Sequence, residues 1–232
     1  MLNYRQNSPQ LGPEYLFEYQ GIKVSWLGHD SFKIKNGKTV IIDPFKIRSS
    51  SEKADILLVS HEHFDHLSID DIKKVASDKT TVVAAASCKN ELSKLKFKEI
   101  RIVHPGDKVQ LDDVTIEAVP AYNLNKFREP GKVFHPKEDA KVGYIVTMKG
   151  VRVYHAGDTD VIPEMKNFKA DLALLPVSGT YVMTPNEAAE AAKIIGPKLA
   201  IPMHYGAIVG SEEDAEKFKQ LASCQVQILK PE

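Results

Sequence analysis

Three of the eight histidines lie within six residues, in the motif HEHFDH at residues 61–66. This motif follows a continuous apolar run at residues 55–60, which is typical of a strand buried on both faces. It precedes a helix start predicted by Ser68 and Asp71, a hydroxyl and a carboxylate spaced as in a capping box. The chain must therefore fold so that four potential ligand side chains gather at one strand-to-helix turn.

The spacing within this motif suits metal coordination. His61 and His63 are two residues apart, so on an extended backbone their imidazoles point to the same side. Asp65 and His66 lie in the following turn and offer a carboxylate and a third imidazole. Neutral imidazole and carboxylate bind divalent metals, zinc above all but also manganese, nickel or iron. The motif therefore predicts one or two metal ions, the first pair of residues binding one ion and the second pair the other.

Two later segments could supply the ligands that such a site still needs. Asp158, in the sequence GDTD, follows a strand-like run, and a carboxylate at a strand end could bridge two cations. His204 follows the apolar run at residues 199–203. Either residue on its own is also typical of an ordinary turn or a structural position, so its value as a ligand depends on the motif that precedes it.

Hydrophobic patterning over the rest of the chain predicts an α/β fold. Short runs of β-branched residues fill the first half, and Asn36-Gly37 between two of them is a strong hairpin signal. Further on, Thr184 and Glu187 form a capping box, and Gly196 stops the helix that they start. Strands are predicted at residues 22–27, 31–35, 38–43, 55–60, 80–85, 142–148, 151–155, 171–177, 199–203 and 225–229, and β structure is predicted to dominate residues 99–120 in three runs, at 99–103, 107–111 and 114–120. Helices are predicted at residues 68–77, 87–95, 184–196 and 211–223.

Residues 121–140 are polar and irregular, which predicts a long loop, and loops of that length in a compact domain usually carry function. Nothing in the sequence marks a linker, a repeat or a low-complexity tract, so we expect one domain over residues 1–232. Residues 1–20 have little periodicity and are expected to form an N-terminal arm on the surface or against a partner subunit. Such an arm would fit a homo-oligomer.

Charge and composition narrow the range of partners. Thirty-one basic residues balance 31 acidic ones, and a net charge of zero argues against a dedicated nucleic-acid binder. The N-terminal segment lacks the apolar stretch of a secretory signal, and no apolar run is long enough to span a membrane. We therefore expect a cytoplasmic protein without a membrane partner, whose two distant cysteines, Cys88 and Cys224, stay reduced.

The order of these motifs resembles the metallo-β-lactamase superfamily, in which HxHxDH is followed by GDT and by a histidine after an apolar strand. The sequence at residues 28–32, 42–44 and 120–123 is similar to that of the branch that contains L-ascorbate-6-phosphate lactonase and N-acyl-phosphatidylethanolamine phospholipase D. The resemblance covers roughly residues 21–205. It implies a four-layer αβ/βα sandwich with the metals at one edge, between the sheets.

The resemblance also implies a role for each residue of the motifs. Asp43 would orient a ligand histidine from the end of its strand, without touching the metal itself. By motif matching, the metal ligands are His61 and His63 for the first ion, Asp65, His66 and His204 for the second, and Asp158 between the two.

The first metal site is incomplete on this reading. Family members usually carry another histidine after the strand at residues 114–120, and the matching position here is Asn123, whose amide oxygen is a weak ligand for zinc. His135 could take its place or could contact substrate, and the first site could also fill only when substrate is bound. These alternatives stay open, and His29, Asn123 and His135 are candidate substrate contacts.

Such a centre predicts hydrolysis. A divalent cation lowers the pKa of bound water from about 15.7 towards 7, and Asp65 could orient that water or accept its proton. No GxSxG serine motif is present, so a metal-activated water is the expected nucleophile. We therefore expect a metal-dependent hydrolase of an ester, lactone or phosphodiester. The many donors at residues 121–140 favour a small phosphorylated or otherwise anionic substrate.

A metal protein that does not hydrolyse its ligand is the alternative. It could be a simple metal-binding module or a redox di-iron protein. The resemblance implies that the di-iron branch carries Glu at the position of His63 and a fused flavin domain, and this sequence has neither.

Overall fold

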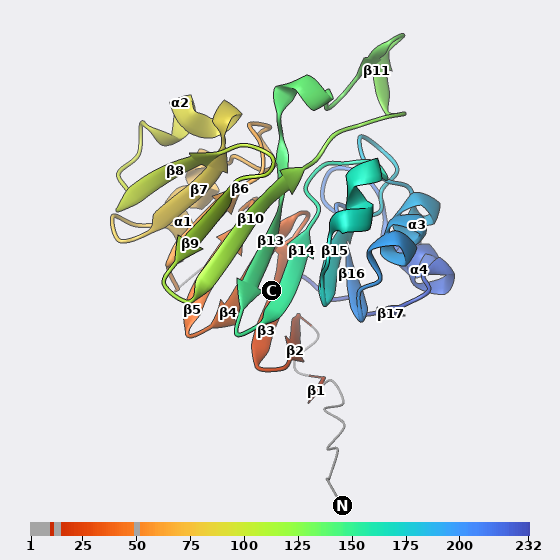
Figure 1. The fold of residues 1–232 in the computed structure, drawn as a ribbon, viewed down its shortest axis with the longest axis horizontal. Coiled ribbons are helices and arrows are strands. Elements are labelled where there is room, and N and C mark those ends of the chain that lie inside the picture. The colour runs from red at the N-terminus through yellow and green to blue at the C-terminus, as the bar shows by residue number, and fades with distance from the viewer. Residues whose placement is uncertain (1–9, 12–14, 49–51) are drawn as a thin grey trace, which may run out of the picture.

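The computed structural model describes residues 10–11, 15–48 and 52–232. Two large β-sheets pack against each other, and the helices lie on the outside (Figure 1). One buried apolar core takes side chains from both sheets. The four-layer αβ/βα sandwich expected from the sequence is confirmed.

The first sheet contains eight strands in the order in which they occur along the chain. Neighbouring strands from β1 to β5 are antiparallel, and those from β5 to β8 are parallel. The strands are Gln10–Leu11 (β1), Leu16–Tyr19 (β2), Ile22–Gly28 (β3), Ser31–Asn36 (β4), Lys38–Ile42 (β5), Ile56–Val59 (β6), Thr81–Ala85 (β7) and Glu99–Val103 (β8).

The second sheet repeats this plan with seven strands in the order β17-β16-β15-β14-β13-β10-β9. The strands from β9 to β14 are antiparallel and those from β14 to β17 are parallel. The strands are Lys108–Leu111 (β9), Val114–Pro120 (β10), Val142–Met148 (β13), Val151–His155 (β14), Leu172–Pro176 (β15), Leu199–Met203 (β16) and Gln225–Val226 (β17). A separate hairpin pairs Phe127–Glu129 (β11) with Lys132–Val133 (β12).

Helical segments fill the parallel crossovers from β6 to β8 and from β14 to β17. Thr184 caps α3 as predicted, since its hydroxyl accepts from the Glu187 amide while the Glu187 carboxylate accepts from the Thr184 amide. Gly196, at φ 67°, ends that helix in the left-handed conformation that glycine adopts without strain. The α-helices are Ile69–Val75 (α1), Lys89–Leu92 (α2), Pro185–Ile195 (α3) and Glu212–Leu221 (α4), with 3₁₀ turns at Ala86–Cys88, Lys137–Asp139 and Pro163–Asn167. In the described part of the chain, none of the helices is long and apolar enough to cross a membrane.

Two hydrogen bonds join the sheets beside the HEHFDH motif. The buried Tyr144 of β13 donates its hydroxyl proton to the Val59 carbonyl at the end of β6, at 2.7 Å. The Val142 amide, also in β13, donates to the Ser60 carbonyl at 3.2 Å. The end of β6 is therefore fixed against the second sheet, and the motif starts at the junction of the two sheets.

The predicted N-terminal arm is only partly described. Residues 16–19 do not lie on the surface as an arm but form β2, where Phe17 pairs with Val24 and is buried in the core. The surface-arm prediction is wrong for this stretch because Phe17 faces the apolar interior of the first sheet. Residues 1–9 and 12–14 lie outside the described residues.

Three other element boundaries differ from the sequence prediction. The loop at residues 121–140 contains the β11–β12 hairpin, which turns at Gly131 with φ 76°. The predicted helix 87–95 is reduced to a 3₁₀ turn and the single turn α2, where the Ser93 hydroxyl donates to the Asn90 carbonyl and so competes with helical hydrogen bonding. The last strand stops at Val226 instead of residue 229.

Candidate metal centre

Four segments with candidate site residues follow the C-terminal ends of strands. The HEHFDH motif follows β6, and Asp158 and His204 follow β14 and β16 of the second sheet. His29 follows β3 of the first sheet. Within the motif, the amides of His66 and Leu67 donate to the His63 carbonyl, which folds residues 63–67 into a tight turn. Ligand-type side chains from both sheets thus converge at the edge where the sheets meet.

A first cluster is formed by His61, His63, His135 and Asp158, whose ligand atoms all lie within 4.8 Å of one another. The Nδ1 atom of His63 is 3.1 Å from His61 Nε2 and 3.3 Å from His135 Nε2. His135 Nε2 is also 3.4 Å from Asp158 Oδ2. His63 is the solvent-facing member, with 41% of its side chain exposed.

Asn123 lies behind this cluster. Its Oδ1 accepts hydrogen bonds from the backbone amide of His135 at 3.0 Å and from His135 Nδ1 at 2.8 Å. Its amide group donates to the Tyr181 carbonyl at 2.9 Å and so fixes the orientation of Asn123 itself. Of the alternatives left open by the sequence, the structure brings the His135 ring into the cluster and uses Asn123 to orient it.

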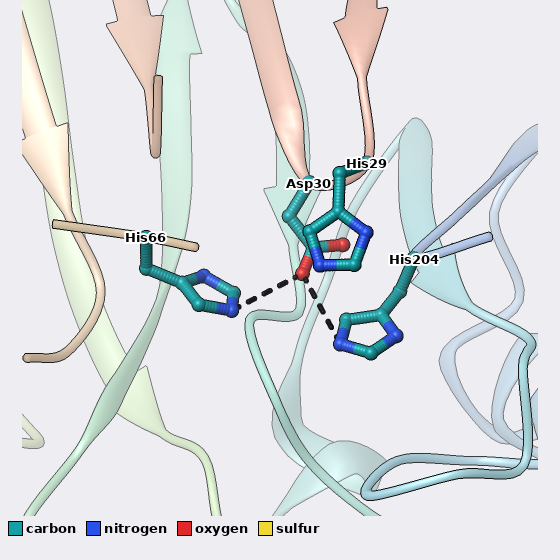
Figure 2. A group of neighbouring side chains, drawn as sticks. All are labelled: His29, Asp30, His66 and His204. Atoms are coloured by element: carbon teal, nitrogen blue, oxygen red, sulfur yellow. Dashed lines mark ion pairs between the residues drawn. The ribbon is translucent and has the colours of Figure 1, made fainter. Parts of the chain in front are cut away.

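A second cluster is formed by His29, Asp30, His66 and His204, all of them buried (Figure 2). Figure 2 shows the Asp30 carboxylate between the rings of His66 and His204. Its Oδ2 atom is 3.4 Å from His66 Nε2 and 3.9 Å from His204 Nε2. The ring of His29 packs on that of His204, with centroids 4.3 Å apart.

Asp158 belongs to both clusters. Its Oδ2 atom faces the first cluster, 3.8 Å from His61 Nε2. Its Oδ1 atom faces the second, 3.3 Å from His66 Nε2 and 3.5 Å from His204 Nε2. One carboxylate therefore presents one oxygen to each group of ligands, which is the arrangement that a bridging residue requires.

Asp65 lies beside the second cluster, next to His29 and His66. Its Oδ2 atom accepts a hydrogen bond from His29 Nε2 at 3.0 Å and is 3.8 Å from His66 Nε2. Asp65 is 13% exposed, whereas His29, predicted to contact substrate, is buried within the second cluster. Asp30 was missed by the sequence reasoning, although a carboxylate beside a histidine at a predicted strand end was the signal that could have found it.

Polar side chains hold the rings of the clusters from behind. The buried Asp43 accepts from His66 Nδ1 at 2.8 Å and from the Ser60 hydroxyl at 2.5 Å. That hydroxyl lies 3.0 Å from His61 Nδ1, and the Ser178 hydroxyl lies 3.0 Å from His204 Nδ1. With Nδ1 occupied in this way, Nε2 of each ring is left to face the cluster.

Three residues of this region have left-handed backbone conformations although they are not glycine. They are His29 at φ 51°, Asp43 at φ 44° and His204 at φ 58°. Such conformations cost on the order of 1–3 kcal/mol each and persist where the surrounding structure imposes them. Their concentration around one set of side chains is typical of a functional site.

Comparison with known proteins decides the family. The sequence model of the beta-lactamase superfamily domain matches residues 23–204. This chain belongs to the metallo-β-lactamase superfamily. The narrower resemblance to the ascorbate-6-phosphate lactonase branch is not established by this match.

The relatives of this metallo-β-lactamase-superfamily chain include named hydrolases. A metal-dependent hydrolase of Methanoculleus marisnigri is 35% identical over 222 residues, which cover 90% of this chain and 94% of the relative. The crystal structure of a metal-dependent hydrolase from Parabacteroides distasonis is similar with a TM-score of 0.79 and 31% identity, covering 97% of this chain and 99% of that one. The expected enzyme class, a metal-dependent hydrolase, is confirmed.

The metallo-β-lactamase fold alone does not determine the reaction. A diiron β-hydroxylase from Streptomyces venezuelae has the same fold, with a TM-score of 0.70 at 14% identity over 92% of this chain and 53% of that one. At this identity the similarity concerns the fold only, so the reaction must be argued from the side chains.

The two clusters of this superfamily member differ in charge. Burial lowers the pKa of His61 well below its usual value and that of His135 to about 4, so the first cluster offers neutral rings. In the second cluster burial acts in the same direction on His204, but Asp158 and Asp30 outweigh it and raise the pKa of His204 to about 9. Burial raises the pKa of Asp30, whereas His66 and His204 overcome burial and hold the pKa of Asp158 low.

The second cluster fits a bound cation. Buried polar atoms without a hydrogen-bond partner cost roughly 1–3 kcal/mol each, so they are rare in folded proteins. Among the side chains of the described residues, all but two of these unpartnered atoms belong to this cluster or to Asp158. They are His29 Nδ1, both carboxylate oxygens of Asp30, His66 Nε2, Asp158 Oδ1 and His204 Nε2. Imidazole nitrogens and carboxylate oxygens are the donor set of zinc, manganese, nickel and iron.

Proposed function

We propose that this metal-dependent hydrolase binds one divalent ion in each cluster and cleaves a small anionic ester, lactone or phosphodiester. The observation that carries the proposal is Asp158, whose two oxygens face two separate groups of imidazoles. Two ions that share one carboxylate lie close enough to act on one substrate group.

The imidazole ligands follow from the ring nitrogens that face each cluster. His61, His63 and His135 would hold one ion, and His66 and His204 the other, with Asp158 between them. Bound divalent ions of this kind lower the pKa of a water ligand from about 15.7 to about 7 and polarise the bond under attack. The chain contributes the fixed orientation of the rings, which Asn123, Asp43 and Ser178 provide from behind.

Asp65 is proposed to orient the attacking water and to accept its proton. The hydrogen bond from His29 Nε2 fixes Oδ2, which leaves Oδ1 to turn towards substrate. Burial opposes ionisation of Asp65, but the His29 hydrogen bond and the nearby His66 lower its pKa, so Asp65 is a carboxylate at neutral pH. The partial exposure of its side chain makes this proton acceptor reachable.

The anionic end of the substrate is proposed to bind cations beside His29, and not those of the loop at residues 121–140 as the sequence suggested. Most cations of the 121–140 loop are already paired: Lys126 with Glu187, Lys132 with Glu129 and Lys137 with Glu164. A cavity of about 730 Å³ lies beside His29 instead and suits a small molecule. Its lining includes the aromatic rings of Phe45 and Tyr205 and the exposed cations Lys46 and Arg48.

The test begins with elemental analysis of the purified protein, followed by a screen of lactones and phosphodiesters with the metal found. We expect turnover that is lost when a chelator removes the metal and regained when the metal is returned. Substituting Lys46 and Arg48 by Ala should raise KM for anionic substrates more than it lowers kcat. The matched control replaces Arg128 and Lys132 of the β11–β12 hairpin by Ala. Turnover that survives complete metal removal would contradict the proposal, and an effect of the control pair alone would move the anion site to the hairpin.

Redox chemistry at a di-iron centre is the second candidate. The observation that favours it is the second cluster, where carboxylates face His66 and His204, because two histidines with a carboxylate are a ligand set of non-haem iron. His63, with its Nδ1 directed into the first cluster, argues against it, since the resemblance associates the di-iron branch with Glu at that position. Iron in the elemental analysis, together with an EPR signal and no turnover on the ester panel, would support this candidate.

A further inference from the structure

We infer that Asp160 is a positioning residue for the first cluster, because it fixes the start of the loop at residues 121–140 so that His135 faces Asp158. The inference rests on the metal site proposed for this cluster, but it concerns the orientation of His135, which exists with or without an ion. Asp160 is the last residue of the GDTD segment and belongs to neither group of ligand side chains. It therefore acts on the cluster only through the residues that it holds.

The first argument is the set of donors that Asp160 gathers from four consecutive residues of the loop. Asp160 is buried, and its Oδ2 atom accepts from the backbone amides of Leu124 at 2.7 Å and Asn125 at 2.9 Å. Its Oδ1 atom accepts from the side-chain amide of Asn123 at 3.3 Å and lies 3.3 Å from Lys126 Nζ. A buried carboxylate is costly unless its oxygens are satisfied, so these contacts hold the start of the loop against the segment that follows β14.

The second argument is that Asn123 passes this restraint on to His135. The Asn123 amide donates to the His135 carbonyl at 2.8 Å, and Asn123 Oδ1 accepts from the His135 amide at 3.0 Å and from His135 Nδ1 at 2.8 Å. The side-chain NH₂ group of Asn123 donates to Asp160 Oδ1 and to the Tyr181 carbonyl. Turning this amide over would set its oxygen against two acceptors and its NH₂ group against two donors. Asp160 thus helps to decide which atom of Asn123 meets His135.

These contacts close a ring that starts and ends at Asp158. The chain joins Asp158 to Asp160, and Asp160 binds Asn123. Asn123 binds His135, whose Nε2 atom returns to Asp158 Oδ2 at 3.4 Å. The Asp160 amide also donates to the Tyr122 carbonyl at 2.9 Å, which holds the same two segments together through the backbone. One short turn therefore carries one ligand-type side chain of the first cluster and sets its separation from another.

Asp71 provides an internal control, because it is built in the same way at another place in the fold. It is buried too, and it accepts from the consecutive amides of Lys46 at 2.8 Å and Ile47 at 3.0 Å. Its other donors are Ser68 and Lys74. None of these residues belongs to either cluster. Replacing Asp71 therefore measures what the loss of such a carboxylate costs in stability alone.

The first test uses the metal-free wild-type protein, so its outcome is separate from that of the proposed function. Hydrogen exchange followed by NMR reports the local openings that expose each proton. The amides of Leu124 and Asn125, which Asp160 binds, should exchange through the same opening as the Nδ1 proton of His135. The three protons should then respond equally to low concentrations of denaturant. Independent responses would overturn the inference without the need for any variant.

The second test compares the isosteric variants Asp160→Asn and Asp71→Asn, again without metal. An amide at position 160 sets an NH₂ group against donors of the loop, so we expect the His135 Nδ1 proton to exchange about tenfold faster or more. Asp71→Asn should leave this proton unchanged at a similar loss of melting temperature. Unchanged exchange in Asp160→Asn, or an equal increase in Asp71→Asn, would reduce Asp160 to a structural role.

Zinc affinity supplies the third test, by titration against a competing chelator, with the sites assigned from anomalous diffraction of zinc-loaded crystals. Asp160→Asn should weaken binding at the first cluster by about tenfold, the low end of the range for outer partners, and leave the second unchanged. Because Asp160 acts through Asn123, it should add little to the loss in an Asn123→Ala background. Fully additive losses would contradict this route. If the wild-type protein binds no zinc, the proposed function fails, and the two metal-free tests still decide the role of Asp160.

Discussion

The two clusters share Asp158 but differ in construction and in charge. The first cluster depends on the 121–140 loop, which delivers His135 through its contact with Asn123, and it reaches solvent at His63. The second is built at the ends of strands β3 and β16 and at the end of the HEHFDH motif, and all its members are buried. Neutral imidazoles dominate the first, whereas the second contains carboxylates paired with imidazoles.

The charge of the two clusters differs because the number of carboxylates that face the buried imidazoles differs. Burial is the largest cause that lowers the pKa of His61 and His135 in the first cluster, neighbouring imidazoles lower it further, and Asp158 opposes them. In the second cluster Asp30 adds a further negative group, and together with Asp158 it reverses the effect of burial on His204. The two buried carboxylates therefore distinguish His204 from the rings of the first cluster, whereas burial still lowers the pKa of His29.

The strongest test removes the residue that the clusters share. Asp158→Ala should weaken metal binding at both clusters and reduce turnover by more than the roughly 10–100-fold typical of an outer partner. Metal content per chain and kcat/KM check this expectation. Asp70→Ala, which removes a carboxylate that is 92% exposed on α1, is the control and should change neither. If Asp158→Ala loses metal from one cluster only, the two sites do not share this carboxylate.

The pH dependence of zinc binding should separate the clusters next. Imidazoles must be neutral to bind metal, and His204, with its pKa raised to about 9, carries a proton at pH 7 in the metal-free protein. Second-cluster affinity should therefore rise as pH increases from 7 to 9, by up to about tenfold per unit for each proton displaced. First-cluster affinity should stay nearly constant over this range, because the pKa of His135 is lowered to about 4.

Titration of the metal-free protein with zinc against a competing chelator resolves the two binding steps at each pH. Equal pH slopes for both steps would contradict the charge difference between the clusters.

The raised pKa of His204 also has a consequence for the stability of the metal-free protein. Its stabilising contribution is fully present below pH 6.5 and is lost as pH rises through about 9, so the melting temperature should fall over that interval.

A smaller effect should follow from the residues that hold the rings. Asn123→Ala frees His135 and should weaken zinc binding at the first cluster by roughly 10–100-fold, leaving the second unchanged. Ser178→Ala removes the partner of His204 Nδ1, so it should weaken zinc binding at the second cluster and leave the first unchanged. We expect a loss at the low end of that range because one hydrogen bond is involved. The double variant should show additive losses, measured by the same chelator competition. A single variant that weakens both sites equally would show that the clusters are not independent.

Much of the fold and half of the candidate centre could be predicted from local sequence. The capping box at Thr184 and Glu187 acts over four residues, so the local sequence is enough to predict it. The HEHFDH motif is likewise local, and Asp158 and His204 follow strands that apolar runs reveal.

The rest depends on contacts between distant segments. His135 enters the first cluster because Asn123, 12 residues earlier, accepts two of its hydrogen bonds. Asp65 accepts a hydrogen bond from His29, which lies 36 residues earlier in the chain. The free oxygens of Asp30 are visible only once the surrounding side chains are placed. Motif spacing could not supply these three facts, since each is decided by tertiary packing.

The hydrogen bonds of Tyr144 and Val142 to the end of β6 limit how this enzyme can adapt. They join the two sheets directly beneath the edge that carries the clusters, so any opening of the sandwich at this edge would have to break them. The β11–β12 hairpin and the walls of the cavity beside His29 take no part in these bonds, so they can vary without disturbing the junction of the sheets. Substitutions in the hairpin and in the cavity walls could thus change which substrates bind, while the geometry of the two clusters stays the same.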